Sequence, residues 1–329
     1  MKKQWISSIL SALLFAGFGG MACAADAPVV LQFAEIHEAD YPTTVGAFEI
    51  AKLVEQRTNG RVKIEIAHSM KLGDEAAVIE KMKTGEIDLT RINIGPVTKY
   101  VPDLNAFLMP YIFRSTGHML KVVNGAIGND VIASFDKSGF IGFGWFDGGT
   151  RSFYTKKPVK KPSDLKDMRI RTLQSTLMLS VVSSFGAKAI AMPHGKTIDA
   201  LKDNSLDGAE NNYPTYDETD HYKLAKYFVE DEHTRNPDII MGSKKALEEK
   251  LTKAEIEIIR QAVREAQPMQ FSLWAKKVKE SKDKVVAAGC VTTVLTAKQK
   301  NAFVAAVKPV YEAQPPDIQE LVKRIKAVK

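Results

Sequence analysis

The sequence predicts an α/β fold built from two successive units, each with a mixed, mostly parallel sheet flanked by helices. Short β-rich segments alternate with helical segments along most of the 329 residues, an order typical of parallel sheets with helices on both faces. The alternation stops at an Asp-Gly-Gly sequence near residue 148 and then begins again. The chain is also long enough for two ordinary domains with separate hydrophobic cores.

The first unit is expected to contain strands and helices in strict alternation. Helical periodicity over residues 43–58 ends at Asn59-Gly60, a sequence that commonly stops a helix. Residues 61–68 alternate apolar and polar side chains, as a half-buried strand does. The expected strands span residues 29–36, 61–68, 87–94 and 140–146, and the expected helices span residues 43–58 and 75–83.

The second unit repeats this rhythm after residue 150. Its expected strands span residues 151–155, 168–172, 188–191 and 206–211, with helices over residues 176–185 and 197–203. Residues 244–284 and 296–329 have helical patterns, the latter interrupted at Pro315-Pro316, and residues 291–295 form a further strand. Such late segments imply that the chain crosses between the units more than once. We expect domain I at 25–148 plus 237–276 and domain II at 149–236 plus 277–329, with a cleft between them that can close by hinge motion.

The first 24 residues have the order of a secretory signal peptide. Two lysines precede an apolar stretch over residues 6–18, and the small-residue sequence Ala22-Cys23-Ala24 follows. The apolar stretch is shorter than the roughly 20 residues that a membrane-spanning helix needs. We therefore expect export to the periplasm and cleavage before Ala25. A lipoprotein anchored through Cys23 is the alternative, although the bulky aliphatic residue usual three positions before such a cysteine is absent.

Charge and cysteine content exclude some classes of protein. The formal net charge is +7, and the excess of 46 Lys and Arg over 39 Asp and Glu is well mixed along the chain. No basic run with interleaved aromatic residues occurs, so nucleic-acid binding is not expected. Once Cys23 leaves with the signal peptide, Cys290 is alone and no intramolecular disulfide can form. We expect Cys290 to be a buried structural thiol.

Sequence motifs for catalysis, metal binding or cofactor binding are missing. No hydrolase, zinc-peptidase, dithiol or dinucleotide-binding motif occurs. Gly195-Lys196-Thr197 matches the end of a phosphate-binding loop, but Ile190 occupies the position of its leading glycine. The six histidines lack the spacing of zinc ligands. We therefore expect no enzyme activity, no metal and no cofactor.

Polar side chains occur where the predicted strands end. They are Arg91, Asn93, Arg151, Arg171, Gln174, Asn211 and Asn212. Because ligands of open α/β sheets bind at the carboxyl ends of the strands, these residues are candidates for a binding cleft. Arginines there could bind a carboxylate through paired, charge-assisted hydrogen bonds. The alternative for each arginine is a surface ion pair with a neighbouring acid.

Five separated motifs occur in a fixed order along the chain. They are Leu72-Gly73-Asp74-Glu75, Gly85-Glu86-Ile87-Asp88-Leu89, Pro110-Tyr111-Ile112-Phe113, Asp164-Leu165-Lys166-Asp167-Met168-Arg169-Ile170-Arg171 and Leu206-Asp207-Gly208-Ala209-Glu210-Asn211. Through these motifs the chain after residue 24 resembles, essentially end to end, the extracytoplasmic binding proteins of TRAP transporters, the DctP-like family. The resemblance implies a two-domain periplasmic binding protein of the Venus-flytrap type, with long shared strands and a long bridging helix. It also implies a monomer that delivers its ligand to the small and large membrane subunits of the transporter.

The resemblance further implies roles for individual residues. Arg171 matches the family arginine that forms a salt bridge with the ligand carboxylate, Arg151 matches a second cleft arginine, and Asn211 matches a cleft amide. Four further residues fall on pocket positions of the sialic-acid-binding branch, namely Glu75, Asn93, Gln174 and His194. At several of these positions the residue in this chain differs from the one typical of that branch.

Segments at residues 37–42, 90–93, 149–154 and 210–212 instead resemble the hexuronate-binding branch, which takes glucuronate or galacturonate. One carboxylate anchor with many hydroxyl partners would suit such a ligand. The expected ligand-binding residues are His37, Glu75, Arg91, Asn93, Arg151, Arg171, Gln174, His194 and Asn211. Because three arginines are present, a C4-dicarboxylate or another small organic acid is an alternative ligand. A periplasmic ligand sensor and the binding protein of an ATP-driven importer are alternative classes of protein that would be compatible with the same fold.

Overall fold

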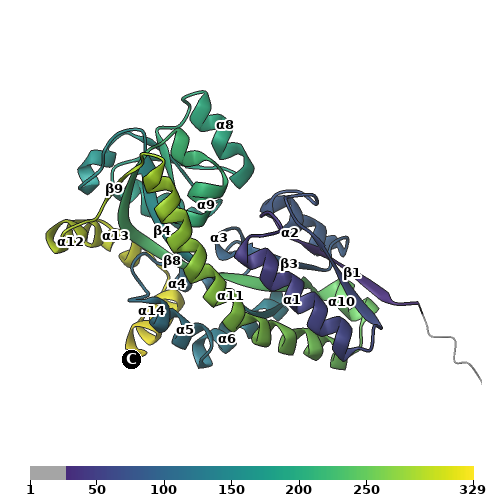
Figure 1. Cartoon of the computed structure of the whole chain (residues 1–329). Helices are drawn as coiled ribbons and strands as arrows, with labels where there is room; N and C mark the ends of the chain where they lie inside the picture. The colour runs from purple at the N-terminus through teal and green to yellow at the C-terminus, as the bar shows by residue number, and fades with distance from the viewer. Residues whose placement is uncertain (1–26) are drawn as a thin grey trace, which may run out of the picture.

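The computed structural model describes residues 27–329 of the chain (Figure 1). The predicted signal peptide and its cleavage before Ala25 lie outside the described residues. Within residues 27–329, no helix is both long and apolar enough to cross a membrane.

The described residues form one hydrogen-bonded sheet of nine strands. The order of strands is β2-β1-β3-β8-β4-β7-β5-β6, and β9 pairs with β8 beside this path. The strands are β1 (Val29–Ala34), β2 (Val62–Ala67), β3 (Leu89–Asn93), β4 (Phe140–Thr155), β5 (Arg169–Thr172), β6 (Lys188–Ala191), β7 (Gly208–Asn211), β8 (Tyr227–Ser243) and β9 (Val291–Thr293).

Two parallel parts of the sheet are joined by its two longest strands. Strands β1, β2 and β3 are mutually parallel and define the first sector, whereas β5, β6 and β7 are mutually parallel and define the second sector. Between them, β8 and β4 run antiparallel to each other, and β8 pairs with β3 while β4 pairs with β7. The carboxyl ends of β3, β5 and β7 therefore approach the place where the sectors meet.

Helices cover both faces of this sheet. They are α1 (Pro42–Arg57), α2 (Glu75–Thr84), α3 (Ile94–Val97), α4 (Leu104–Leu108), α5 (Thr116–Val123), α6 (Ala126–Ser134), α7 (Thr176–Ser184), α8 (Thr197–Lys202), α9 (Tyr213–Glu218), α10 (Lys244–Lys250), α11 (Lys253–Ala287), α12 (Ala297–Ala306), α13 (Lys308–Glu312) and α14 (Pro316–Ala327). Helix α11, with 35 residues, packs against α1 in the first sector and α9 in the second, and Figure 1 shows it running diagonally along both. The prediction of a mixed α/β fold with a long helix is confirmed.

Two predicted boundaries differ from the structure. The Asp-Gly-Gly sequence was expected to end a strand, but β4 continues through it with a register shift between Asp147 and Thr150. Gly149 has a φ of +79° there, a conformation that glycine adopts without steric cost. Residues 244–284 form two helices rather than one, because Thr252 caps α11 through a hydrogen bond from the Glu255 backbone N–H. Cys290 is buried, as expected.

Candidate functional site

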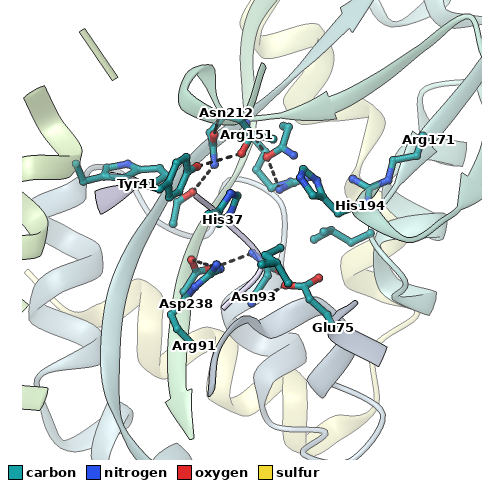
Figure 2. Close-up of a pocket in the computed structure, with 16 residues that line it drawn as sticks. His37, Tyr41, Glu75, Arg91, Asn93, Arg151, Arg171, His194, Asn212 and Asp238 are labelled. Atoms are coloured by element: carbon teal, nitrogen blue, oxygen red, sulfur yellow. Dashed lines mark hydrogen bonds and ion pairs between the residues drawn. The ribbon is translucent and has the colours of Figure 1, made fainter. Parts of the chain in front are cut away.

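A cavity lies where the carboxyl ends of β3, β5 and β7 meet (Figure 2). The space around it that no atom fills is about 400 Å³, but this volume includes open solvent, and the part that the centre of a water molecule can occupy is about 30 Å³. Its lining consists of Ile36, His37, Tyr41, Glu75, Arg91, Asn93, Gly148, Arg151, Arg171, Leu173, His194, Asn211, Asn212, Thr215, Asp238 and Trp274.

Arg91 is the cation on the first-sector side of the cavity. It is buried at the centre of β3, where its Nε donates to Glu35 Oε2 at 2.8 Å and its Nη2 contacts Glu35 Oε1. Its Nη1 donates to Asp238 Oδ2 at 3.3 Å, and Asn93 Nδ2 donates to Asp238 Oδ1 at 3.1 Å. Burial opposes the charge on Arg91, but the two carboxylates outweigh it and raise the pKa of the guanidinium. Arg91 is thus bonded to protein acids.

Arg151 forms a second ion pair on β4. Its Nε and Nη2 donate to the two carboxylate oxygens of Glu210 at 2.5 and 2.9 Å, and its Nη1 donates to Asn211 Oδ1 at 2.8 Å. Behind Glu210 lies His233, whose Nε2 is 3.4 Å from that carboxylate and whose Nδ1 is 2.8 Å from Asp231 Oδ2. Burial favours the neutral acid, but Arg151 outweighs it and lowers the pKa of Glu210 to about 2.

Arg171 differs from the other two arginines. It is 2% exposed on β5, and its Nε and Nη2 donate to the backbone oxygen of Met192 at 3.0 and 2.8 Å. Within residues 27–329 it forms no ion pair. Burial, followed by the neighbouring Arg151 cation, lowers the pKa of Arg171. A buried cation with a carbonyl as its hydrogen-bond partner is a suitable partner for an anion in the cavity.

Glu75 places a carboxylate opposite this arginine. It is the first residue of α2, and Asp74 caps that helix by accepting a hydrogen bond from the Ala77 backbone N–H at 3.0 Å. Glu75 Oε1 in turn accepts from the Asn93 backbone N–H at 3.1 Å. Burial raises the pKa of Glu75 above the usual glutamate value.

Two histidines and a tyrosine complete the polar lining between the sectors. The His37 ring stacks on Tyr41 with centroids 3.7 Å apart, and the His194 ring lies 5.7 Å from His37. His37 Nδ1 is 2.9 Å from Glu218 Oε2, and the Tyr41 hydroxyl is 3.1 Å from the Thr215 hydroxyl. Burial, followed by nearby positive charge, holds the pKa of His194 well below its ordinary value.

Comparison with known proteins connects this architecture to a family. A model of the bacterial extracellular solute-binding proteins, family 7 (DctP), matches residues 33–316. The chain belongs to this family. A solute-binding protein of Chromohalobacter salexigens is 33% identical over 294 residues, which are 88% of this chain and 87% of that protein.

Solved structures agree with this assignment. A TRAP periplasmic solute-binding protein of Pseudomonas putida F1 with bound D-glucuronate has 36% identity and a TM-score of 0.88, covering 92% of this chain and 98% of that one. A TRAP periplasmic solute-binding protein of Xanthobacter autotrophicus Py2 with bound β-D-galacturonate has 33% identity and a TM-score of 0.87, covering 91% and 100%. The family binds solutes without converting them, so the prediction of an extracytoplasmic binding protein rather than an enzyme is confirmed.

In this family 7 protein, the cavity brings together eight of the nine residues expected from the sequence. The exception is Gln174, which follows β5 but is partly exposed and does not belong to the lining. Sequence reasoning missed other polar lining residues, namely Tyr41, Thr215 and Asp238, together with Trp274 of α11. Asn212, which the sequence placed at a predicted strand end without including it among the expected ligand-binding residues, also lines the cavity. Asp238 lies on β8, which the sequence pattern did not reveal.

Proposed function

We propose that this protein binds a hexuronate, D-glucuronate or D-galacturonate, in the cavity and delivers it to the membrane subunits of a TRAP transporter. The hexuronate-bound structures of Pseudomonas putida F1 and Xanthobacter autotrophicus Py2 support this ligand class. We further propose export to the periplasm with cleavage of the leader before Ala25, and ligand-induced closure between domains at 25–148 plus 237–276 and 149–236 plus 277–329.

The state of Arg171 carries the proposal. Arg91 and Arg151 are each bonded to protein carboxylates, whereas Arg171 has no such partner among residues 27–329. A ligand carboxylate would supply the missing negative charge. The single uncompensated guanidinium favours a ligand with one carboxylate over a C4-dicarboxylate, which would need a second cationic anchor. The remaining lining residues supply donors and acceptors that suit the hydroxyls of a sugar acid.

Arg171→Gln tests this anchor directly. The substitution leaves a buried ligand carboxylate without its cation, so we expect hexuronate binding to weaken by about 2–5 kcal/mol. Isothermal titration calorimetry with D-glucuronate and D-galacturonate measures the change. A thermal-shift screen of organic acids complements it, because a ligand at about 100 times its Kd stabilises by about 2.7 kcal/mol.

Arg169→Gln is the matched control on the same strand. Arg169 forms an ion pair with Asp207 at 2.9 Å, and both side chains are substantially exposed, at 41% and 35%. Its loss removes the same formal charge without touching the cavity lining, so hexuronate affinity should stay at the wild-type value. Wild-type affinity in Arg171→Gln would contradict the proposed anchor.

A further inference from the structure

The cavity has opposite charges on its two sides. Figure 2 shows Glu75 and Asp238 on the side that also holds Arg91 and Asn93, whereas Arg171 and Arg151 lie across the cavity. The acids come from the start of α2 and from β8 next to β3, and the arginines come from β5 and β4. A ligand that spans the cavity therefore meets acids at one end and the free guanidinium at the other.

The charge of Arg91 does not neutralise the acidic side. Arg91 contacts Glu35 through two nitrogens and Asp238 through the third, so one cation is shared by two carboxylates before Glu75 is counted. Glu75 Oε1 accepts from a backbone N–H, and within residues 27–329 its other carboxylate oxygen receives no hydrogen bond. Burial raises the pKa of both Glu75 and Asp238, which indicates that this region already disfavours negative charge.

We propose that Glu75, with Asp238 beside it, selects against ligands that carry a second carboxylate at the end remote from Arg171. This inference rests on the proposed hexuronate function. It concerns which chemical groups the cavity accepts at the end of the ligand that faces α2. A hydroxyl at that end donates a hydrogen bond to a carboxylate, whereas a second carboxylate can only accept and is repelled by the acids. The ligand class excluded is the aldaric acids, in which both ends of the sugar chain are carboxylates.

The test compares D-glucuronate with D-glucarate, its dicarboxylate counterpart, and D-galacturonate with galactarate in parallel. D-Gluconate, an open-chain sugar acid with one carboxylate, controls for the loss of the ring. Calorimetric titration of the wild type should give a Kd for the aldarate at least about 100-fold above that of the hexuronate, because like charges in close contact cost several kcal/mol.

Glu75→Gln keeps the shape of the side chain and removes its charge. We expect it to reduce the ratio of aldarate Kd to hexuronate Kd at least tenfold, and Glu75→Ala, which removes the same charge, should reduce it also. Glu65→Gln on β2 is the control, since Glu65 is exposed and outside the cavity lining, and its ratio should equal that of the wild type. The ligand-free melting temperature of each variant verifies that it is folded.

Two results would overturn the inference. The first is a wild type that binds aldarate as tightly as hexuronate. The second is a ratio of aldarate Kd to hexuronate Kd that is the same in both Glu75 variants as in the wild type. Aldarate binding that is undetectable in the wild type and in both variants counts as this second result. A wild type that binds neither D-glucuronate nor D-galacturonate is a separate outcome, because it contradicts the proposed function itself. Tight D-gluconate binding together with weak D-glucarate binding would attribute the discrimination to the second carboxylate alone.

Discussion

At the scale of single residues, the three cavity arginines were predictable as candidates from the strand pattern, and the family resemblance pointed to Arg171 as the carboxylate anchor, but their acid partners were not predictable. Each arginine stands in or beside a β segment recognisable from the sequence. Their partners, however, are distant in the chain: Glu35 and Asp238 lie 56 and 147 residues from Arg91, and Glu210 lies 59 residues from Arg151. Spacing along a sequence cannot reveal which acids neutralise which cations. Only the folded sheet identifies Arg171 as the arginine without an acid partner in the described chain.

His233 gives a prediction about stability at alkaline pH. Burial disfavours its charged form, but Asp231 and Glu210 outweigh this and raise the pKa of His233 to about 9. Because the folded pKa lies above the unfolded value near 6.5, the stabilisation is complete below pH 6.5 and is lost as pH rises through 9. Urea unfolding should show His233→Gln less stable than the wild type at pH 6.5, by up to about 3 kcal/mol, with the gap narrowing by pH 9.5. A gap that is constant over this range would show that the charge of His233 contributes nothing.

At the scale of elements, the parallel sectors were predicted well because alternating strands and helices carry clear local signals. The expected segments at residues 61–68, 75–83 and 188–191 correspond closely to β2, α2 and β6. Strand β8 was missed because its middle is polar and contains Pro237, which is unusual inside a sheet. Pro237 pairs with Asp147 next to the register shift in β4, where the ladder is already irregular. Local patterns thus fail where long-range pairing decides the structure.

At this scale we predict an effect of Gly149 on stability, because the absence of a side chain there lets β4 approach α11 closely. This glycine has a φ of +79°, and a Cβ atom there would lie 2.7 Å from the Trp274 ring. Gly149→Ala therefore adds a steric clash to backbone strain, and we expect it to destabilise by about 2–5 kcal/mol. Gly60→Ala is the control, since Gly60 has a similar φ of +77° and open space around it, so its cost should be about 1–2 kcal/mol. Equal losses in urea unfolding would show that contact with Trp274 is irrelevant.

At the scale of the whole molecule, direct contacts join the two sectors beside the cavity. Glu218 at the end of α9 accepts from the Glu38 backbone N–H at 3.1 Å and lies 2.9 Å from His37 Nδ1. Burial favours the neutral acid, but His37 and the backbone N–H outweigh it and lower the pKa of Glu218, so the carboxylate is charged at neutral pH. We therefore expect these contacts to favour closure without a ligand, with the ligand then shifting a population that already includes the closed form.

Glu218→Ala should therefore weaken hexuronate binding although Glu218 does not line the cavity. Loss of a charge-assisted hydrogen bond is worth about 1.5–3 kcal/mol, so we expect affinity to fall by about tenfold or more as the closed form becomes less populated. Small-angle X-ray scattering should give a larger radius of gyration for the ligand-free variant than for the wild type, and saturating hexuronate should restore the wild-type curve. Lys223→Ala is the control, because it removes an ion pair with Asp220 that is more than half exposed and contributes little. If Glu218→Ala matches the wild type in both scattering and affinity, closure depends on the ligand and not on this contact between the sectors.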